Sequence, residues 1–313
     1  MSNPIYPELQ SVDRIADAFE RDGYICSSRI ATVVFLAAAM NKPILVEGPP
    51  GVGKTELAKT CAAVVNKPLV RLQCYEGLDE AKALYEWKYG KQLLYTQVLR
   101  EQLGEVLGDS QGLRESMQKL HQFSDVFYSE SFLEPRPLLR AMEYAEGSVL
   151  LIDEIDKADF EFESLLLEVL SDFQVSIPEI GTIEATSKPL VFLTSNDTRD
   201  LSDALKRRCL HLHIPYPTLE LEARIIAARV PDLQRGLSEQ LVGFVHALRE
   251  LDLKKVPAIS ETIDWARALM LLNAQALDER LIHDTLNVLL KYEEDVSATE
   301  GQLHQLLRQV TSA

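Results

Sequence analysis

The chain has 313 residues, of which 46% are hydrophobic and 26% charged, a composition ordinary for a globular protein and unlike that of a disordered or fibrous one. Its formal net charge of −16 would repel a phosphate backbone, which counts against a large nucleic-acid-binding surface but leaves room for a local basic pore. The length exceeds that of one compact domain, so we expect two.

The absence of certain sequence motifs predicts the cellular location of the protein and its lack of a structural metal. It has no basic stretch followed by an apolar leader and no long uncharged apolar run, so we expect a cytoplasmic protein without a membrane span. The four cysteines form no CxxC pair and are expected to be reduced. His211 and His213 alternate along a predicted strand, and no HExxH occurs, so we expect no structural metal.

Short β-rich runs alternate with helical patterns in the first two thirds of the chain. They lie at 42–47, 69–73, 148–153, 189–195 and 209–214. After the first run, Leu57, Cys61, Val64 and Val65 repeat at helical spacing and predict one apolar helix face. Strands that alternate with helices form parallel sheets covered on both faces, so the pattern predicts an α/β fold with a parallel five-stranded sheet.

A glycine-rich turn lies between the first predicted strand and the following helix. Residues 48–55 read GPPGVGKT and fit GxxxxGK[ST], in which backbone N–H groups and a helix N-terminus hold phosphates. Lys54 would reach the β and γ phosphates, and Thr55 would ligate Mg²⁺. The residues expected to bind the nucleotide are Gly48, Pro49, Pro50, Gly51, Val52, Gly53, Lys54, Thr55, Glu56 and Asp153.

Two carboxylates, Asp153 and Glu154, end the third predicted strand. Parallel strands bind ligands at their carboxyl ends, so we expect Asp153 to join Thr55 at Mg²⁺ through the water shell of the ion. Glu154 would orient and deprotonate the attacking water. The fourth strand ends at Asn196, whose amide could bind the γ phosphate or that water, although such an asparagine alone is usually a turn former.

Two arginines lie where a predicted helix runs into the fifth strand. Phosphoryl transfer needs positive charge near its transition state, and at this junction the sequence DALKRRC resembles AAA+ ATPases, which supply an arginine to the neighbouring subunit. Arg208 matches that position best, and Arg207 is adjacent; the alternative is a helix end stabilised by its dipole. The resemblance implies ATP and Mg²⁺ as ligands and a head-to-tail ring of identical subunits, usually a hexamer.

The pattern becomes entirely helical after Pro215 and Pro217. We therefore expect an AAA+ nucleotide-binding core at 1–215 and a helical lid domain at 216–313. The apolar faces of this second domain are predicted at Leu237, Leu241, Phe244, Val245, Leu248 and Leu251, and at Leu281, Ile282, Leu286, Leu289 and Leu290.

Two segments are similar to insertions of the MoxR group of AAA+ ATPases. The first follows the second strand, as a hairpin inserted into helix 2 would, and its Tyr85, Trp87 and Tyr89 alternate so that they would share one face. The second, at 170–185, has the pattern of a hairpin before the strand that ends at Asn196. In the MoxR group both insertions tend to face a central pore and could grip a client; the aromatic residues could equally pack on the domain body.

The runs CYEGLDEAKALYEW and ETIDWARAL resemble the CoxD-like branch of that group. The resemblance spans nearly the whole chain, except the charged segment at about 96–135. It implies a chaperone-like ATPase that matures or activates a metalloenzyme, for this branch a molybdenum-containing dehydrogenase, together with a von Willebrand factor A protein. Residues 23–25 resemble the segment that holds adenine, although an ordinary linker explains them almost as well.

One departure from the AAA+ pattern concerns the second domain. Many AAA+ lids place an arginine at the start of a helix, but residues 257–262 read PAISET. Arg267, more than a turn later, is the candidate substitute; otherwise the coupling between lid and nucleotide rests on other contacts.

Two other functions use the same core. A nucleic-acid motor is disfavoured by the acidity of the chain and by the lack of a basic tail. An ATP-binding switch or scaffold with little turnover is disfavoured by Glu154, because a pure binder needs no carboxylate that activates water.

Overall fold

The computed structural model describes residues 6–98, 128–178 and 180–311. The strands are β1 (Ile44–Glu47), β2 (Leu69–Gln73), β3 (Tyr85–Trp87), β4 (Leu133–Pro135), β5 (Val149–Asp153), β6 (Gln174–Ile177), β7 (Gly181–Glu184), β8 (Leu190–Ser195) and β9 (Leu210–His213). The helices up to β9 are η1 (Pro7–Leu9), α1 (Val12–Arg21), α2 (Ser28–Met40), α3 (Lys54–Val64), α4 (Glu80–Ala83), α5 (Tyr89–Val98), η2 (Glu130–Phe132), α8 (Pro137–Glu143), η3 (Ile155–Lys157), α9 (Phe160–Asp172) and α10 (Asp203–Arg208). The C-terminal helices are α11 (Leu219–Arg229), α12 (Arg235–Arg249), α13 (Ile259–Leu271), α14 (Glu279–Leu289), α15 (Glu293–Glu300) and α16 (Leu303–Thr311).

The centre of the fold is a parallel sheet with the strand order β2-β5-β8-β1-β9. Its members are the five strands predicted from the sequence, and each falls inside its predicted range. β5 and β8, which lie inside the sheet, are buried along their whole length. The predicted α/β class with a parallel five-stranded sheet is therefore confirmed.

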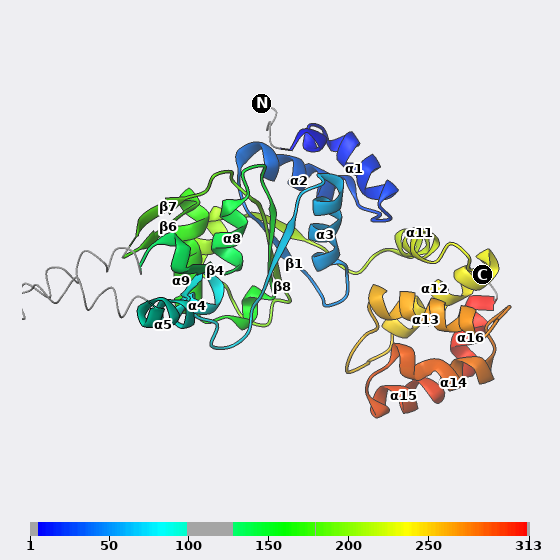
Figure 1. Ribbon diagram of the computed structural model, residues 1–313. Helices are drawn as coiled ribbons and strands as arrows, with labels where there is room; N and C mark the ends of the chain where they lie inside the picture. Colours follow the sequence, from blue (N-terminus) through cyan, green and yellow to red (C-terminus); the bar gives the residue numbers. More distant parts are fainter. Residues whose placement is uncertain (1–5, 99–127, 179, 312–313) are drawn as a thin grey trace, which may run out of the picture.

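Helices cover both faces of this sheet (Figure 1). Successive side chains of a strand point to opposite faces, so β5 contributes to two cores. Val149 and Leu151 pack with residues of α1, α2 and α3, whereas Leu150 and Ile152 pack with residues of α8 and α9. Each such aliphatic side chain contributes about 1.5–3 kcal/mol on full burial, so both layers hold the strand ends in fixed positions.

The helix after the glycine turn is confirmed as α3. Leu57 and Cys61 are fully buried, Val65 nearly so, and Val64 packs at the edge of the same core. Gly53 caps the helix with a positive φ of 96°, which puts the N-terminus of α3 at the carboxyl end of β1.

The first insertion contains the antiparallel pair β3 and β4. Trp87 is buried, and the ring of Tyr85 lies edge-on to it. Tyr89 departs from the predicted shared face, because the strand ends at Trp87 and Tyr89 begins α5 with 63% of its side chain exposed. Of the charged segment at about 96–135, which the resemblance does not cover, residues 99–127 lie outside the described part.

The second insertion is the antiparallel hairpin of β6 and β7, with Gln174 opposite Glu184. It lies between α9 and β8, as the alternation of residues 170–185 predicted. The hairpin therefore directly precedes β8, the strand that Asn196 follows.

The C-terminal helices pack around Trp265, which is fully buried and donates its indole N–H to Thr285 Oγ1 at 2.8 Å. In Figure 1 these helices lie beside the part of the chain that contains the sheet. The division into domains at residues 215 and 216 stays a prediction. Both predicted apolar faces are in this core, with Leu251 and Leu281 at its edge and the others buried: Leu237, Leu241, Phe244, Val245, Leu248, Ile282, Leu286, Leu289 and Leu290.

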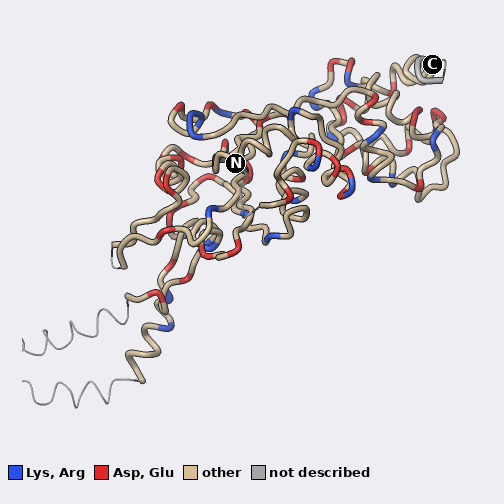
Figure 2. The backbone as a smooth tube through the Cα atoms, turned by 90° about the horizontal axis from the view of Figure 1, so that it is seen from above, with Lys and Arg blue, Asp and Glu red and all other residues tan. Residues whose placement is uncertain are grey.

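Acidic residues are spread over both the sheet-containing part and the C-terminal helices (Figure 2). Among the described residues no helix combines the length and the apolar character needed to cross a membrane.

Candidate nucleotide-binding site

A cavity of about 760 Å³ opens at the carboxyl ends of the parallel strands. Its walls come from three separate parts of the chain: the segment at 23–30, the glycine turn with the strand ends, and residues 212–263. The predicted nucleotide-binding residues from Pro50 to Glu56 line it, as do Asp153, Glu154 and Asn196. Gly48 and Pro49 do not line it, although they lie in the same turn.

The glycine turn is pressed against its neighbours at two points. A Cβ on Gly48, whose φ is +148°, would lie 2.1 Å from the carbonyl oxygen of Ile214. A Cβ on Gly51, whose φ is +75°, would lie 2.5 Å from Ser260 Oγ and 2.6 Å from the Cβ of Ala258. Because real side chains do not approach so closely, only glycine lets the turn pass between the segment after β9 and the start of α13.

Lys54 is 7% exposed, and its ammonium group has three acceptors. It donates to the carbonyl oxygens of Gly48 at 2.6 Å and Pro49 at 2.8 Å, and to Asn196 Oδ1 at 2.7 Å. Burial lowers the pKa of Lys54, and nearby carboxylates, that of Asp156 first, oppose this shift without cancelling it. The ammonium group of Lys54 therefore lies folded back on its own turn and also binds Asn196, the residue that follows β8.

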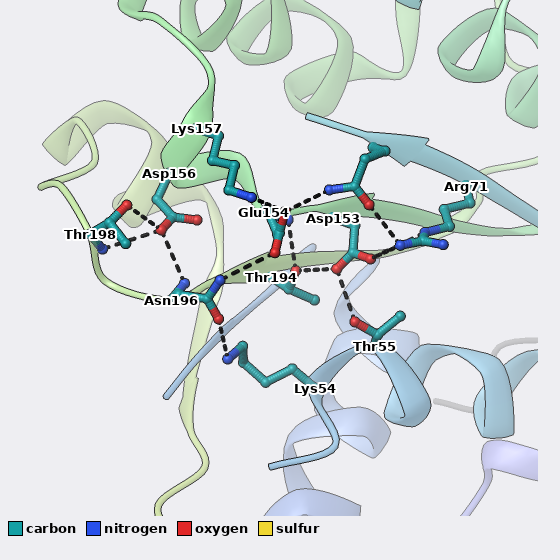
Figure 3. Close-up of polar contacts among 11 residues, drawn as sticks. Lys54, Thr55, Arg71, Asp153, Glu154, Asp156, Lys157, Thr194, Asn196 and Thr198 are labelled. Carbon is teal, nitrogen blue, oxygen red and sulfur yellow. Dashed lines mark hydrogen bonds and ion pairs between the residues drawn. The ribbon is translucent and has the colours of Figure 1, made fainter. Parts of the chain in front are cut away.

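Asp153 is 3% exposed and accepts two donors on each carboxylate oxygen (Figure 3). Its Oδ1 accepts from Thr55 Oγ1 at 3.0 Å and from Thr194 Oγ1 at 2.5 Å. Its Oδ2 accepts from Arg71 Nε at 3.1 Å and Nη2 at 2.6 Å. Neither Thr194 nor Arg71 was predicted as a site residue. Arg71 lies two residues before Gln73 on the same strand, and Gln73 pairs in register with Asp153.

Glu154 has a left-handed backbone, with φ +58°, and its N–H donates to Thr194 Oγ1 at 2.9 Å. Its Oε2 accepts from Lys157 Nζ at 2.6 Å and from Gln73 Nε2 at 2.8 Å. The bond to Glu154 raises the pKa of Lys157. A left-handed conformation is unfavourable for a residue with a side chain, so the surrounding bonds hold this carboxylate in a defined position.

Asn196 connects the lysine and the glutamate. Its Oδ1 accepts from Lys54, and its Nδ2 donates to Glu154 Oε1 at 3.4 Å. The turn that carries it is held by buried Asp156, whose Oδ2 accepts the N–H groups of Asn196 at 3.3 Å and Thr198 at 3.2 Å and the Thr198 hydroxyl at 2.6 Å. Asn196 thus lines the cavity and lies between Lys54 and Glu154, as Figure 3 shows for these three side chains.

The oxygen donors at this end of the cavity fit Mg²⁺. Thr55 donates its hydroxyl proton to Asp153, which leaves the lone pairs of Oγ1 for a metal ion. Carboxylate, hydroxyl and phosphate oxygens together are the ligands that Mg²⁺ prefers. Thr55 and Asp153 are therefore well placed to hold the ion that accompanies a nucleotide.

Arg207 and Arg208 lie at the end of α10, and both are exposed. Arg208 donates to Ser171 Oγ at 2.6 Å and to the carbonyl oxygen of Ala204 at 3.1 Å. Neither arginine lines the cavity of its own chain.

The suggested substitute for a lid arginine, Arg267, does not reach the cavity. Its side chain is 59% exposed and lies 3.6 Å from Asp264, one turn earlier on α13. Arg229, at the end of α11, lines the cavity instead and donates to Glu56 Oε1 at 2.5 Å. Nothing in the local sequence around Arg229 distinguishes it from an ordinary basic residue at a helix end.

The segment at 23–25 also lines the cavity. Tyr24 is buried, and its ring lies edge-on to that of Phe19, 5.9 Å away. Apolar residues that include Ile25, Ile225 and Ile263 line the same cavity, so it has an apolar part as well as the polar one.

Comparison with known proteins adds the following. Residues 43–209 match the family described as AAA domain (dynein-related subfamily). An uncharacterized protein of Staphylococcus haemolyticus is 30% identical over 238 residues, which cover 74% of this chain and 76% of that protein. A counterpart in Staphylococcus aureus is 29% identical over the same length. The structure of the Thermotoga maritima RuvB Holliday junction branch migration motor matches with a TM-score of 0.45 and 17% identity, over 91% of this chain and 72% of RuvB.

Proposed function

This chain belongs to the AAA domain family of the dynein-related subfamily, and we propose that it is a Mg²⁺-dependent ATPase that remodels a protein client. The observation that carries the proposal is the convergence of Lys54, Thr55, Asp153, Glu154 and Asn196 at one cavity. These residues come from α3 and from the ends of β5 and β8, and they are joined by hydrogen bonds. A glycine turn that served only as a connection would not account for the convergence of these five residues.

Each residue has a role in hydrolysis. Lys54 exchanges the carbonyl oxygens of Gly48 and Pro49 for phosphate oxygens, since all are acceptors at similar reach. Thr55 and Asp153 would hold Mg²⁺, which would supply positive charge against the negative charge that develops on the phosphates. Glu154, once released from Lys157, accepts a proton from the attacking water, and Asn196 orients that water.

We assign the missing positive charge to a neighbouring subunit. Arg207 and Arg208 are exposed and distant from the cavity of their own chain, which fits an arginine finger that acts in trans. A head-to-tail contact of this kind closes into a ring, and a hexamer is our proposal for its size.

The finer function rests on the resemblance to the MoxR group. The β3–β4 pair and the β6–β7 hairpin occupy the expected places of its two insertions. On this basis we propose a metalloenzyme, of the molybdenum-containing dehydrogenase type, as the client and a von Willebrand factor A protein as the partner. The aromatic grip in the first insertion is limited to exposed residues such as Tyr89, because Trp87 is buried.

Replacement of Glu154 by glutamine tests the proposal. We expect Glu154→Gln to bind ATP with nearly wild-type affinity and to lose phosphate release by a factor of about 10² to 10⁴, the usual contribution of a general base. Glu239→Gln is the matched control, since Glu239 is exposed on α12 and pairs with Arg235 in its own helix. Unchanged phosphate release in Glu154→Gln would favour the ATP-binding switch.

Two further measurements address the assembly and the client. Mixing an Arg207→Ala/Arg208→Ala variant with a Lys54→Ala variant should restore part of the activity if sites are shared between subunits. The Glu154→Gln protein, purified with ATP from its native cell, should retain a von Willebrand factor A protein and a cofactor-bearing enzyme. Recovery of neither protein would leave only the ATPase activity.

A further inference from the structure

Arg71 is a cation that already lies at the metal end of the cavity. It belongs to the edge strand β2, lines the cavity, and has 50% of its side chain exposed. Its Nε and Nη2 both donate to Asp153 Oδ2, at 3.1 Å and 2.6 Å. A nearly buried carboxylate is therefore neutralised by a guanidinium group that can still move toward solvent.

The two oxygens of Asp153 differ in what a metal ion would change. At Oδ1, the bond from Thr55 is compatible with metal binding, because the Thr55 hydroxyl donates this hydrogen bond and its oxygen lone pairs remain available. At Oδ2, a metal-bound water would have to donate to the oxygen on which both Arg71 bonds converge. The guanidinium and the hydrated ion are both positive, so they compete for this oxygen and repel each other.

We propose that Arg71 is a resident counter-cation that keeps free divalent metal off Asp153 until a triphosphate brings the ion with it. The phosphates supply the negative charge that lets Mg²⁺ and Arg71 share the site. Without them Mg²⁺ and Arg71 would share the nearly buried Asp153, because the more exposed Glu154 already pairs with Lys157. The inference rests on the proposed function only in that Mg²⁺ with a nucleotide is the ligand of the cavity.

Arg71 also sets the direction of a neighbouring amide. Its Nη2 donates to Gln73 Oε1 at 2.6 Å, which leaves Gln73 Nε2 to donate to Glu154 Oε2 at 2.8 Å. Because an amide has one acceptor end and one donor end, these two bonds fix its orientation. If Arg71 moved away from Asp153, Gln73 would lose the bond that fixes its amide, and its hydrogen bond to Glu154 would change as well.

The test measures Mn²⁺ binding to the full chain without nucleotide, by electron paramagnetic resonance of the free ion. Arg71→Gln should bind Mn²⁺ at least about tenfold more tightly than wild type, since a charge within 4–6 Å shifts ion affinities by about that factor or more. Arg71→Lys keeps the charge and should stay close to wild type. Arg235→Gln removes the same charge from an exposed site on α12, so it corrects for the net charge of the chain.

Nucleotide provides the second comparison. With a non-hydrolysable ATP analogue present, wild type and Arg71→Gln should differ much less, because the phosphates then supply most of the binding. Equal Mn²⁺ affinities of Arg71→Gln and Arg235→Gln without nucleotide would overturn the proposal. So would a wild-type protein that binds Mn²⁺ equally well with and without the analogue, a result that needs no variant to fold.

These outcomes are independent of hydrolysis. If the chain bound ATP without turning it over, phosphate release would be absent while the Mn²⁺ difference between wild type and Arg71→Gln remained. If the inference alone were wrong, phosphate release would remain and the Mn²⁺ difference would be absent.

Discussion

Asp156 is a positioning residue for Asn196, and its removal should lower turnover without lowering nucleotide affinity much. Asp156 is 4% exposed, and its Oδ2 receives three hydrogen bonds from the turn that carries Asn196 and Thr198. It does not line the cavity, so its effect on catalysis passes through this turn, with a further contribution from its charge near Lys54.

The size of the effect follows from these bonds. Hydrogen bonds to a charged group contribute about 1.5–3 kcal/mol, and a buried donor left without a partner costs about 1–3 kcal/mol. Two of the three bonds are long, so we expect Asp156→Ala to lower the free energy of unfolding by about 3 kcal/mol. A shift of about 1 Å in a group that orients the reacting water costs about 10²-fold in rate, which is the loss of kcat that we expect.

The assay is steady-state phosphate release together with direct nucleotide binding. For Asp156→Ala, kcat should fall about 10²-fold while the Kd for ATP changes by less than about threefold. Asn196→Ala should show a similar loss, and the double variant should lose little more than either single one, because both act through the same amide. Asp200→Ala is the matched control, since the Asp200 side chain is 98% exposed in the same loop.

Full additivity of the Asp156 and Asn196 substitutions would refute this reasoning. The reasoning would also be refuted if Asp156→Ala had a lower melting temperature but, at a temperature where it is folded, turned over ATP at the wild-type rate. In that case Asp156 would stabilise the loop without positioning the amide.

Two further predictions concern stability and reactivity. Glu222 is fully buried and binds Arg249 at 2.5 and 2.8 Å, so Glu222→Gln should cost about 3 kcal/mol in urea unfolding, against at most about 1 for the exposed Glu239→Gln; equal costs would contradict this reading of the C-terminal core. Burial raises the pKa of Cys74 and of Cys209 to about 12 and also raises that of Cys61, so their thiolate fraction at pH 8 is about 10⁻⁴ or less. A thiol reagent should label half-buried Cys26 first in the native protein and all four cysteines in urea; equal native rates would show that the core opens readily.

The central sheet could be predicted because each of its strands can be recognised from its own few residues. Each strand is a short apolar run, and alternation with helices is enough to imply parallel pairing. The glycine turn and the carboxylates at Asp153 and Glu154 could be predicted for the same reason. The residues of each motif are contiguous in the sequence, so a single short segment contains the functional groups that indicate its chemistry.

The contacts that the sequence did not reveal depend on register between distant strands. Arg71 and Asp153 are 82 positions apart, and they meet because β2 and β5 pair with Gln73 opposite Asp153. Thr194 reaches Asp153 from β8 in the same way. A single sequence does not contain the pairing that places Thr194 and Arg71 on either side of this carboxylate.

The expected position of Tyr89 and the candidate role of Arg267 both differ from the structure for local reasons. Tyr89 was assigned to a strand by alternation alone, but Gln92 N–H donates to the carbonyl oxygen of Lys88, so the chain is already helical there. Arg267 lies eight residues into α13, about 12 Å along the axis from the end that meets the glycine turn. Its partner Asp264 lies one turn earlier, on the exposed side of the helix.

The close approach of Gly51 to α13 gives the nucleotide a mechanical route to the C-terminal helices. No space remains between the turn and the side chains of Ala258 and Ser260, so a displacement of the turn by even a few tenths of an ångström must push the first residues of that helix. A rigid helix transmits such a push along its length, so we expect the filling of a small anion cradle to displace the helices that pack on α13. This transmission depends on contact between atoms, and salt that screens charges would leave it intact.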